Sequence, residues 1–156
     1  MDRTHDLQRT VLRTQAQRLG DAAEVSVAAH LAAGGWTLLG RNVRFGRNEV
    51  DLLAVDPGPP AALVVVEVRW RGSRAFGVGE ETFDWRKRSH LRAAVGRILD
   101  SRALPDGTPL PRLPVRIDLV IVEPAEGSPP SGSLAASLVA PSAVPRMRHH
   151  RDALVG

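Results

Sequence analysis

The segment Leu63–Arg69, with the sequence LVVVEVR, constrains the fold of this chain more than any other. It is short, rich in valine and almost continuously apolar, as expected of a strand that is buried on both faces. Such a strand lies at the centre of a sheet that is covered on both sides. The acid Glu67 within it is an exception, because charged side chains are rarely buried without a partner.

The surrounding segments predict a single α/β domain. Short turns rich in Gly and Pro separate three strands, which should form an antiparallel meander. A helix lies between the third strand and a fourth, and this connection suits a parallel crossover. The expected order is α-β-β-β-α-β, a central mixed sheet flanked by helices. The expected elements are a helix at 22–33, strands at Trp36–Val43, Glu49–Val55 and Leu63–Arg69, a helix at Asp84–Leu99 and a strand at Val115–Val122.

Composition divides the 156 residues into four parts. Residues 1–19 are expected to be a helical lead-in, and residues 20–123 the α/β domain. Residues 124–145, rich in Pro, Ser, Gly and Ala, are expected to be a flexible linker. Residues 146–156 are expected to be a basic tail that could dock as a final element. The start has no apolar signal region and no run approaches the ~18 apolar residues of a spanning helix, so a cytoplasmic location is expected.

Two acids are expected to meet across the hairpin that precedes the central strand. If the turn is centred on Pro59, residues at equal distances from it face each other. Asp51 then lies opposite Glu67, with Cβ atoms about 5 Å apart, and Glu49 lies opposite Arg69. This register is an assumption, and a slip of one residue would move each side chain to the other face.

Two carboxylates in apolar strands repel each other and are costly to bury. A divalent cation would offset that cost. Arg69 would offset part of it in a purely structural network. The chain has no cysteine, so a metal would be bound by oxygen or imidazole ligands. A metal held by two carboxylates suits phosphoryl chemistry, because it polarises a phosphate oxygen and lowers the pKa of bound water.

The charge balance is compatible with a nucleic-acid partner without requiring one. The formal net charge is +4, and Lys87 is the single lysine among the 21 Lys and Arg residues. A coding bias towards arginine is the simplest explanation of that ratio. The lysine that remains is a candidate for a position where a compact ammonium group matters.

Several blocks of the sequence resemble the YraN family. They occur in order at compatible spacing over about residues 18–122, with a weaker match at His149–Leu154. The family belongs to the restriction-endonuclease-like, PD-(D/E)-x-K, superfamily and is similar to archaeal Holliday-junction resolvases. The matching blocks are Gly20–Glu24, Arg41–Arg44, Asn48–Leu53, Val65–Arg71, Lys87 and Arg116–Val120.

The resemblance implies a nuclease site that uses Mg²⁺ or Mn²⁺. It makes Asp51 and Glu67 metal ligands, together with the backbone carbonyl of Val68. Glu49 matches the acid that the family has two residues before this aspartate. Asn48 stands where the family usually has glycine. The turn before the strand is therefore expected to differ from the family pattern.

The resemblance also assigns the remaining catalytic positions. Glu24 would be the helical acid, with Asp21 as its competitor. Arg69 stands where the superfamily has its catalytic lysine. Arginine can bind a phosphate but cannot accept a proton. Catalysis is then weak or lost, or Lys87 on the following helix takes the role; otherwise Lys87 contacts phosphate or is simply solvated.

Basic residues close to these positions in sequence are candidate phosphate contacts. They are Arg44, Arg71, Arg74, Arg86, Lys87 and Arg88. Trp70 falls on the face opposite Glu67 and is expected in the core, whereas Trp85 could belong to the core or stack on a base. Asp118 is expected to be structural, and His149 to belong to the tail.

Three functions follow as hypotheses. The first is a divalent-metal-dependent DNA endonuclease, with a preference for branched DNA such as Holliday junctions by analogy alone. The second is a nucleic-acid-binding module with weak or no catalysis that acts with a partner DNA-processing enzyme. The third is a structural adaptor. Expected partners are double-stranded or branched DNA and, since a junction resolvase pairs two active sites, a second copy of the chain; no membrane partner is expected.

Overall fold

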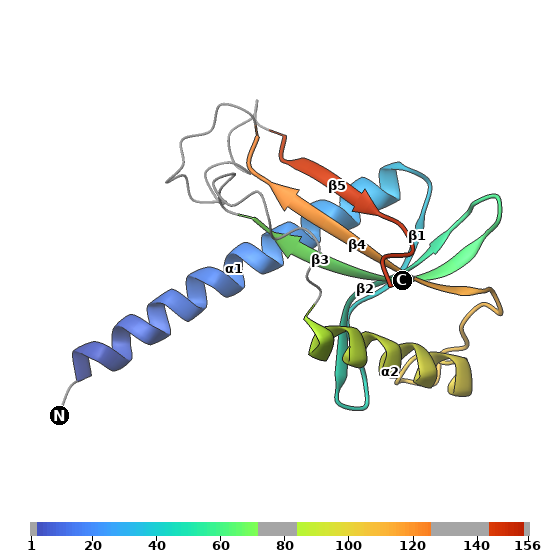
Figure 1. Cartoon of the computed structure of the whole chain (residues 1–156), viewed down its shortest axis with the longest axis horizontal. Coiled ribbons are helices and arrows are strands. Elements are labelled where there is room, and N and C mark those ends of the chain that lie inside the picture. Colours follow the sequence, from blue (N-terminus) through green and yellow to red (C-terminus); the bar gives the residue numbers. More distant parts are fainter. Residues whose placement is uncertain (1–2, 72–83, 126–143, 155–156) are drawn as a thin grey trace.

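The computed structural model describes residues 3–71, 84–125 and 144–154. Its strands form one sheet in the order β1-β2-β3-β4-β5 (Figure 1). Neighbouring strands are antiparallel except β3 and β4, which are parallel. The predicted mixed α/β sheet of a restriction-endonuclease-like core is therefore confirmed. The elements are α1 (Arg3–Ala33), β1 (Thr37–Phe45), β2 (Asn48–Asp56), β3 (Ala62–Trp70), α2 (Trp85–Ser101), β4 (Val115–Glu123) and β5 (Arg146–His150).

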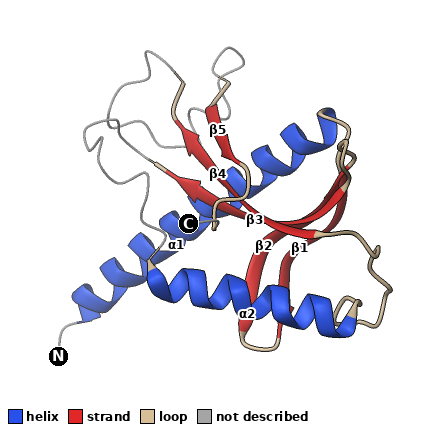
Figure 2. Cartoon of the chain, turned by 45° about the vertical axis from the view of Figure 1, so that its right-hand side comes forward, coloured by secondary structure: helices blue, strands red, loops and turns tan. Residues whose placement is uncertain are grey.

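The two helices pack against opposite faces of the sheet (Figure 2). The core on the α1 side includes Val27, Leu31, Leu52, Val64 and Val66. The core on the α2 side includes Leu53, Val65, Leu91, Ile98 and Ile121. Alternate residues of β3 thus enter different cores, which explains why its sequence is apolar almost without a break and confirms it as a central strand.

The first helix is longer than the predicted 22–33. It runs from Arg3 to Ala33 without a break across the expected boundary at residue 19, and Figure 1 shows its N-terminal part extending beyond the sheet. It ends where the Gly34 N–H donates to the carbonyl of His30 at 3.1 Å and Gly35 adopts a φ of +87°. Glycine takes this left-handed conformation without strain, so the glycine pair sets the point at which the chain turns into β1.

The second helix is held at both ends by local hydrogen bonds. Asp84 caps its start, because its carboxylate accepts from the Arg86 N–H at 3.2 Å. Arg102 ends it in a left-handed conformation, with a φ of +48°, and donates its N–H to the carbonyl of Ile98 at 2.8 Å. The Arg102 guanidinium also donates to the carbonyl of Leu113 at 3.0 Å, which stabilises this unusual conformation. The helix therefore presents a fixed N-terminal turn to the sheet.

The predicted register between β2 and β3 is confirmed where these strands pair. Leu52 faces Val66 and Asp56 faces Ala62, so partners are equidistant from Pro59. The described pairing ends at Leu52. Asp51 and Glu67 are the next positions in the same register.

The described ladder between β2 and β3 does not include the expected pair of Glu49 and Arg69. Glu49 pairs with Arg44 of β1, and its carboxylate contacts the Arg44 guanidinium at 3.1 Å. The physical reason is that β2 continues with β1 after its ladder with β3 has ended. Asp51 thus lies just beyond the end of the ladder between β2 and β3.

The basic segment at the C-terminus forms a fifth strand. β5 is antiparallel to β4, with His150 opposite Leu119 and Arg146 opposite Glu123. The segment expected to be a tail thus extends the sheet, and the element order becomes α-β-β-β-α-β-β. The expected linker at 124–145 falls largely on residues 126–143, which lie outside the described residues. In the part of the chain that the structure describes, no helix combines the length and apolar character needed to cross a membrane.

Candidate functional site

Asp51 and Glu67 lie where β2 and β3 separate. The N–H of Val68 donates a hydrogen bond of 2.8 Å to Oδ2 of Asp51. Glu67 is only 6% exposed, and the alternation along β3 places it on the α2 side, the side of Val65. The Asp51 carboxylate thus replaces a backbone acceptor beyond the end of the ladder. This bond fixes the carboxylate beside β3.

Glu67 holds its proton to an unusually high pH. Burial raises the pKa of Glu67 most, and the charge of Asp51 and a hydrogen bond with the Asp51 carboxyl raise it further, to about 8. The ammonium group of Lys87 opposes this rise, because its Nζ lies 3.1 Å from Oε2 of Glu67. Two carboxylates this close do not ionise easily together, so the pair favours a state in which one of them keeps a proton.

Lys87 reaches Glu67 because of its position on α2. The spacing from Lys87 to the buried residues Leu91, Ala94 and Ile98 follows one face of the helix. The side chain therefore points towards the sheet and is only 31% exposed. The single lysine of the chain is thus the cation in contact with the buried acid. Arg69 lies two residues after Glu67 in β3, half-buried and opposite Ile121 of β4.

Glu24 approaches the same acids from α1. Burial raises the pKa of Glu24 to about 6, with a further increase from the charge of Asp51 and a smaller one from Asp21. Oε2 of Glu24 is buried and accepts no hydrogen bond from the described residues. Asp21 is exposed and acts on the site only as a nearby charge. Of the two candidate helical acids, the structure brings Glu24 next to Asp51.

Sequence reasoning did not single out Asn42, which orients Glu24. The Asn42 side chain hydrogen-bonds the Glu24 carboxylate and lowers its pKa, as does the charge of Arg41. Asn42 has a φ of +48°, a left-handed conformation that asparagine tolerates better than most residues. Asparagine is also uncommon within strands. Its presence in the middle of β1 was the signal that could have identified it.

The fold family implies a divalent metal ion, which needs donor groups in the carboxylate site. In residues 3–71, 84–125 and 144–154, no three or more His, Cys, Asp or Glu side chains form a group that could hold a metal ion. The donors available are the carboxylates of Asp51 and Glu67 and the backbone carbonyl of Val68, with the unsatisfied Oε2 of Glu24 nearby. All are oxygen donors, the type that Mg²⁺ and Mn²⁺ prefer. The donor chemistry fits such a cation.

The predicted phosphate contacts fall into different settings. Arg86, Lys87 and Arg88 occupy the first turns of α2, and Nε of Arg88 is buried without donating to any described residue. Arg71 follows β3, and its N–H donates to the carbonyl of Val122 at 2.9 Å. Arg74 lies outside the described residues. Among the predicted phosphate contacts, Arg86 and Arg88 are therefore closest in sequence to Lys87, which contacts Glu67.

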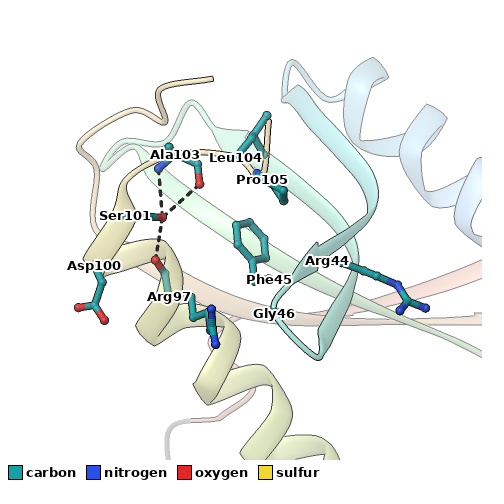
Figure 3. A pocket seen from close by; sticks show the side chains of 9 residues that line it. All are labelled: Arg44, Phe45, Gly46, Arg97, Asp100, Ser101, Ala103, Leu104 and Pro105. Carbon is teal, nitrogen blue, oxygen red and sulfur yellow. Dashed lines mark hydrogen bonds between the residues drawn. The ribbon is translucent and has the colours of Figure 1, made fainter. Parts of the chain in front are cut away.

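Arg44 lines a separate pocket. A pocket of about 410 Å³ lies between the β1–β2 hairpin and the C-terminal end of α2 (Figure 3). Figure 3 shows the Arg44 guanidinium turned away from the other lining side chains, and that guanidinium is paired with Glu49. Because Lys87 lies at the opposite end of α2, this pocket is not part of the carboxylate site. The pocket lining is Arg44, Phe45, Gly46, Arg97, Asp100, Ser101, Ala103, Leu104 and Pro105.

A second group of charges lies on the α1 face of the sheet. Asp118 is completely buried and accepts from Nε and Nη2 of Arg116 at 2.8 and 2.9 Å. His149 Nε2 lies 2.8 Å from the same carboxylate, which also accepts from the Asp152 N–H at 3.0 Å. Burial alone would raise the pKa of Asp118, but these hydrogen bonds outweigh it and hold the pKa below its ordinary value. Asp118 thus ties β4 to β5, consistent with a structural role.

This network extends to the end of β2. The Arg116 guanidinium also donates to Asp56 at 2.9 Å and lies 5.7 Å from the ring centre of Trp36. The ring of His149 packs against Trp36 at 5.5 Å between centroids. Asp56 and Asp118 both pair with Arg116, whereas at the other site the described residues provide a basic partner, Lys87, for Glu67 but none for Asp51. His149 is therefore part of the sheet and not of a free tail.

Comparison with known proteins finds similarity to one family. A family model described as "Uncharacterised protein family UPF0102" matches residues 23–122, the range that contains the carboxylate site and Lys87. UPF0102 protein STH1475 of Symbiobacterium thermophilum is 36% identical over 124 residues, 80% of this chain and 94% of that protein. UPF0102 protein XCV0816 of Xanthomonas euvesicatoria is 39% identical over 114 residues, 73% of this chain and 84% of that protein.

Proposed function

The chain belongs to the UPF0102, or YraN, family of the restriction-endonuclease-like superfamily, and we propose that it is a divalent-metal-dependent DNA endonuclease. The observation that supports this most is the pair formed by Asp51 and Glu67, in which the buried acid has a pKa raised to about 8 and contacts Lys87. A purely structural charge pair would be satisfied, as at Asp118. A buried acid whose pKa is strongly raised beside another charged group is typical of reaction sites.

In this proposal Asp51 and Glu67, with the Val68 carbonyl, hold Mg²⁺ or Mn²⁺. The bound ion would polarise a phosphate oxygen and lower the pKa of a water molecule. Glu24 adds a third carboxylate whose buried oxygen has no hydrogen bond from the described residues. The charge that develops on the phosphate would be stabilised by the Lys87 ammonium. Arg88 and Arg86, on the same turns of α2, would position the neighbouring phosphates.

A second candidate function is DNA binding without catalysis, in cooperation with a DNA-processing enzyme. Arg69 favours it, because arginine replaces the superfamily's catalytic lysine and cannot accept a proton. The Lys87–Glu67 contact is also compatible with it, since the ammonium group already offsets part of the negative charge at the site. Preference for branched DNA and assembly as a homodimer belong to the first proposal by analogy with junction resolvases.

The test is cleavage of a labelled four-way junction and a linear duplex by the full chain in Mg²⁺, Mn²⁺ or EDTA. We expect metal-dependent nicking that Asp51→Asn abolishes. Glu49→Gln is the matched control, because Glu49 lies two residues away on β2 and is exposed and paired with Arg44. Cleavage that persists in Asp51→Asn would disprove the assignment of the site. Tight binding without product in either metal would instead support the binding-module function.

A further inference from the structure

Trp85 is an aromatic side chain in a position where packing does not explain it. It is the first residue of α2 and is 70% exposed, although the indole ring is mostly apolar. The chain's other two tryptophans are much less accessible: Trp36 is 9% exposed and Trp70 is half-buried. An isolated exposed tryptophan carries no conclusion by itself. The residues around Trp85 support a more specific conclusion.

Trp85 lies on the same helical turn as a residue of the candidate reaction site. It is two residues before Lys87, whose Nζ is 3.1 Å from Glu67. Both residues belong to the first turn of α2, which spans about 5.4 Å along the helix axis. They point about 200° apart, because each residue advances about 100° around the helix. Lys87 therefore faces the sheet while Trp85 stands on the outer side of the same turn.

The ring of Trp85 is set among cations. The guanidinium carbon of Arg86 lies 5.6 Å from the ring centre, and Lys87 and Arg88 follow directly. The acid next to the ring, Asp84, is used as the helix cap, where it accepts the Arg86 N–H. Aromatic rings interleaved with basic side chains bind single-stranded nucleic acids, because phosphates contact the cations while bases stack on the rings.

The geometry of DNA determines which kind of strand could use this ring. Successive nucleotides of a duplex strand lie ~3.4 Å apart along the axis, and one turn of a helix is about 5.4 Å long. One turn of α2 therefore has the length of one or two nucleotides. In a duplex each base is already stacked and shows only its edges in the grooves. An indole face can therefore stack only on a base that has left the duplex or was never paired.

We propose that Trp85 is a stacking platform for an unpaired nucleobase near the phosphate that reaches Glu67 and Lys87, with the strand passing around the first turn of α2. The substrate class is thus DNA with unpaired bases close to the cleavage position, such as a flap, a bulge or a branch point. This inference rests on the proposed nuclease function for the position of the phosphate. The stacking step itself requires no metal, so it can be measured separately from cleavage.

The test measures binding of the full chain in EDTA to three oligonucleotides. These are a single strand, the same strand with abasic sites, and a fully paired duplex. The single strand should quench tryptophan fluorescence, and Trp85→Phe should remove most of that quenching. Trp85→Ala should weaken binding of the single strand by about 5- to 100-fold, the usual effect of losing one stacked base.

The remaining oligonucleotides separate stacking from simple charge attraction. Trp85→Ala should bind the abasic strand and the duplex as the unaltered chain does, because neither offers a free base face. Leu99→Ala is the matched control, since Leu99 is a 46% exposed apolar residue at the other end of α2. Equal losses on normal and abasic strands, or no loss on either, would overturn the stacking proposal.

Cleavage assays with the same oligonucleotides in Mn²⁺ distinguish this inference from the proposed function. Base-dependent binding through Trp85 without any cleavage would remove the nuclease function and leave the stacking surface intact. Cleavage of the paired duplex as fast as of the single strand, unchanged by Trp85→Ala, would support the nuclease function and remove Trp85 from it. The two proposals therefore fail by different observations.

Discussion

The contact between Lys87 and Glu67 decides how much negative charge the candidate site carries. Burial and Asp51 favour the protonated form of Glu67, while the ammonium group of Lys87 favours the ionised form. A divalent cation would compete for the same carboxylate, because it also favours the ionised form. Lys87 thus keeps Glu67 closer to the ionised form that binds a cation, without being a metal ligand itself.

The raised pKa of Glu67 predicts a dependence of stability on pH. Between about pH 4.5 and 8 the folded chain holds this proton and the unfolded chain does not, so Glu67 lowers the free energy of unfolding as pH rises through this range. Glu67→Gln should remove this effect and become more stable relative to the unaltered chain, on the order of a few kcal/mol by pH 8.

Urea unfolding in EDTA at several pH values from 5 to 8.5 would measure the difference. A gap between the two proteins that stays constant with pH would show that Glu67 has an ordinary pKa in the folded chain. Because both proteins contain the same histidines, titration of those rings cancels in the comparison.

Lys87→Ala is predicted to slow cleavage at least about 100-fold, because the phosphate loses a preorganised cation. Lys87 also lowers the pKa of Glu67, so the pH at which cleavage becomes half-maximal should rise in this variant. Arg92→Ala, an exposed change on the same helix, is the control and should leave both rate and profile unchanged. A slower rate with an unmoved pH profile would argue that Lys87 acts only on DNA binding.

At the scale of secondary structure, sequence periodicity predicted the central elements well. The buried strand at Leu63–Arg69 and the turn around Pro59 fixed the register that brings Asp51 beside Glu67. Sequence periodicity did not predict β5, because a run of basic residues lacks the apolar pattern of a strand. In addition to its ladder with β4, β5 is held by the buried carboxylate of Asp118, whose partner His149 is 31 residues away in sequence. Long-range charge pairs of this kind leave no local pattern.

The candidate site was predictable only in part for the same reason. The two strand acids followed from a hairpin and its register. The approach of Lys87 depends on how α2 packs on the sheet, and Asn42 depends on a left-handed residue within β1. Neither feature has a short-range signature strong enough to be assigned a role from one sequence.

Asp118→Asn is predicted to loosen β5 and destabilise the chain by about 3 kcal/mol, because it breaks a buried ion pair and leaves Arg116 less compensated. The pKa of Asp118 is depressed in the folded chain, so its contribution is present above the ordinary aspartate pKa near 4 and is lost as pH falls from that value through the lower pKa of the folded chain. The difference from the unaltered chain should therefore shrink in acid.

Urea unfolding and amide hydrogen exchange of Arg146–His150 provide the measurement. Asp100→Asn changes an exposed carboxylate at the end of α2 and should alter stability by less than about 0.5 kcal/mol. Unchanged exchange in β5 of the Asp118 variant would show that backbone pairing alone holds that strand to β4.

For the whole molecule, the sheet separates two kinds of charge. The satisfied network of Asp56, Arg116 and Asp118 lies on the α1 face, where it joins three strands. Glu67 and Lys87 lie on the α2 face, where a buried acid and a cation are in contact beyond the end of the ladder between β2 and β3. Substitutions in the network on the α1 face should therefore affect stability and leave the residues of the proposed site unchanged, whereas Glu67 belongs to the proposed site and also affects stability.

The last prediction concerns how the basic turn of α2 contributes to DNA affinity. Each phosphate contact releases counterions, so the slope of log K against log salt concentration measures the number of contacts. Arg86→Ala and Arg88→Ala should each reduce the magnitude of that slope by about 1 and weaken binding of all sequences alike. Arg112→Ala is the control, because Arg112 is exposed in the loop before β4 while Glu67 lies towards the other end of β3. If Arg112→Ala changes the slope as much as Arg88→Ala does, the positive charge acts through the whole surface and α2 is not the contact element.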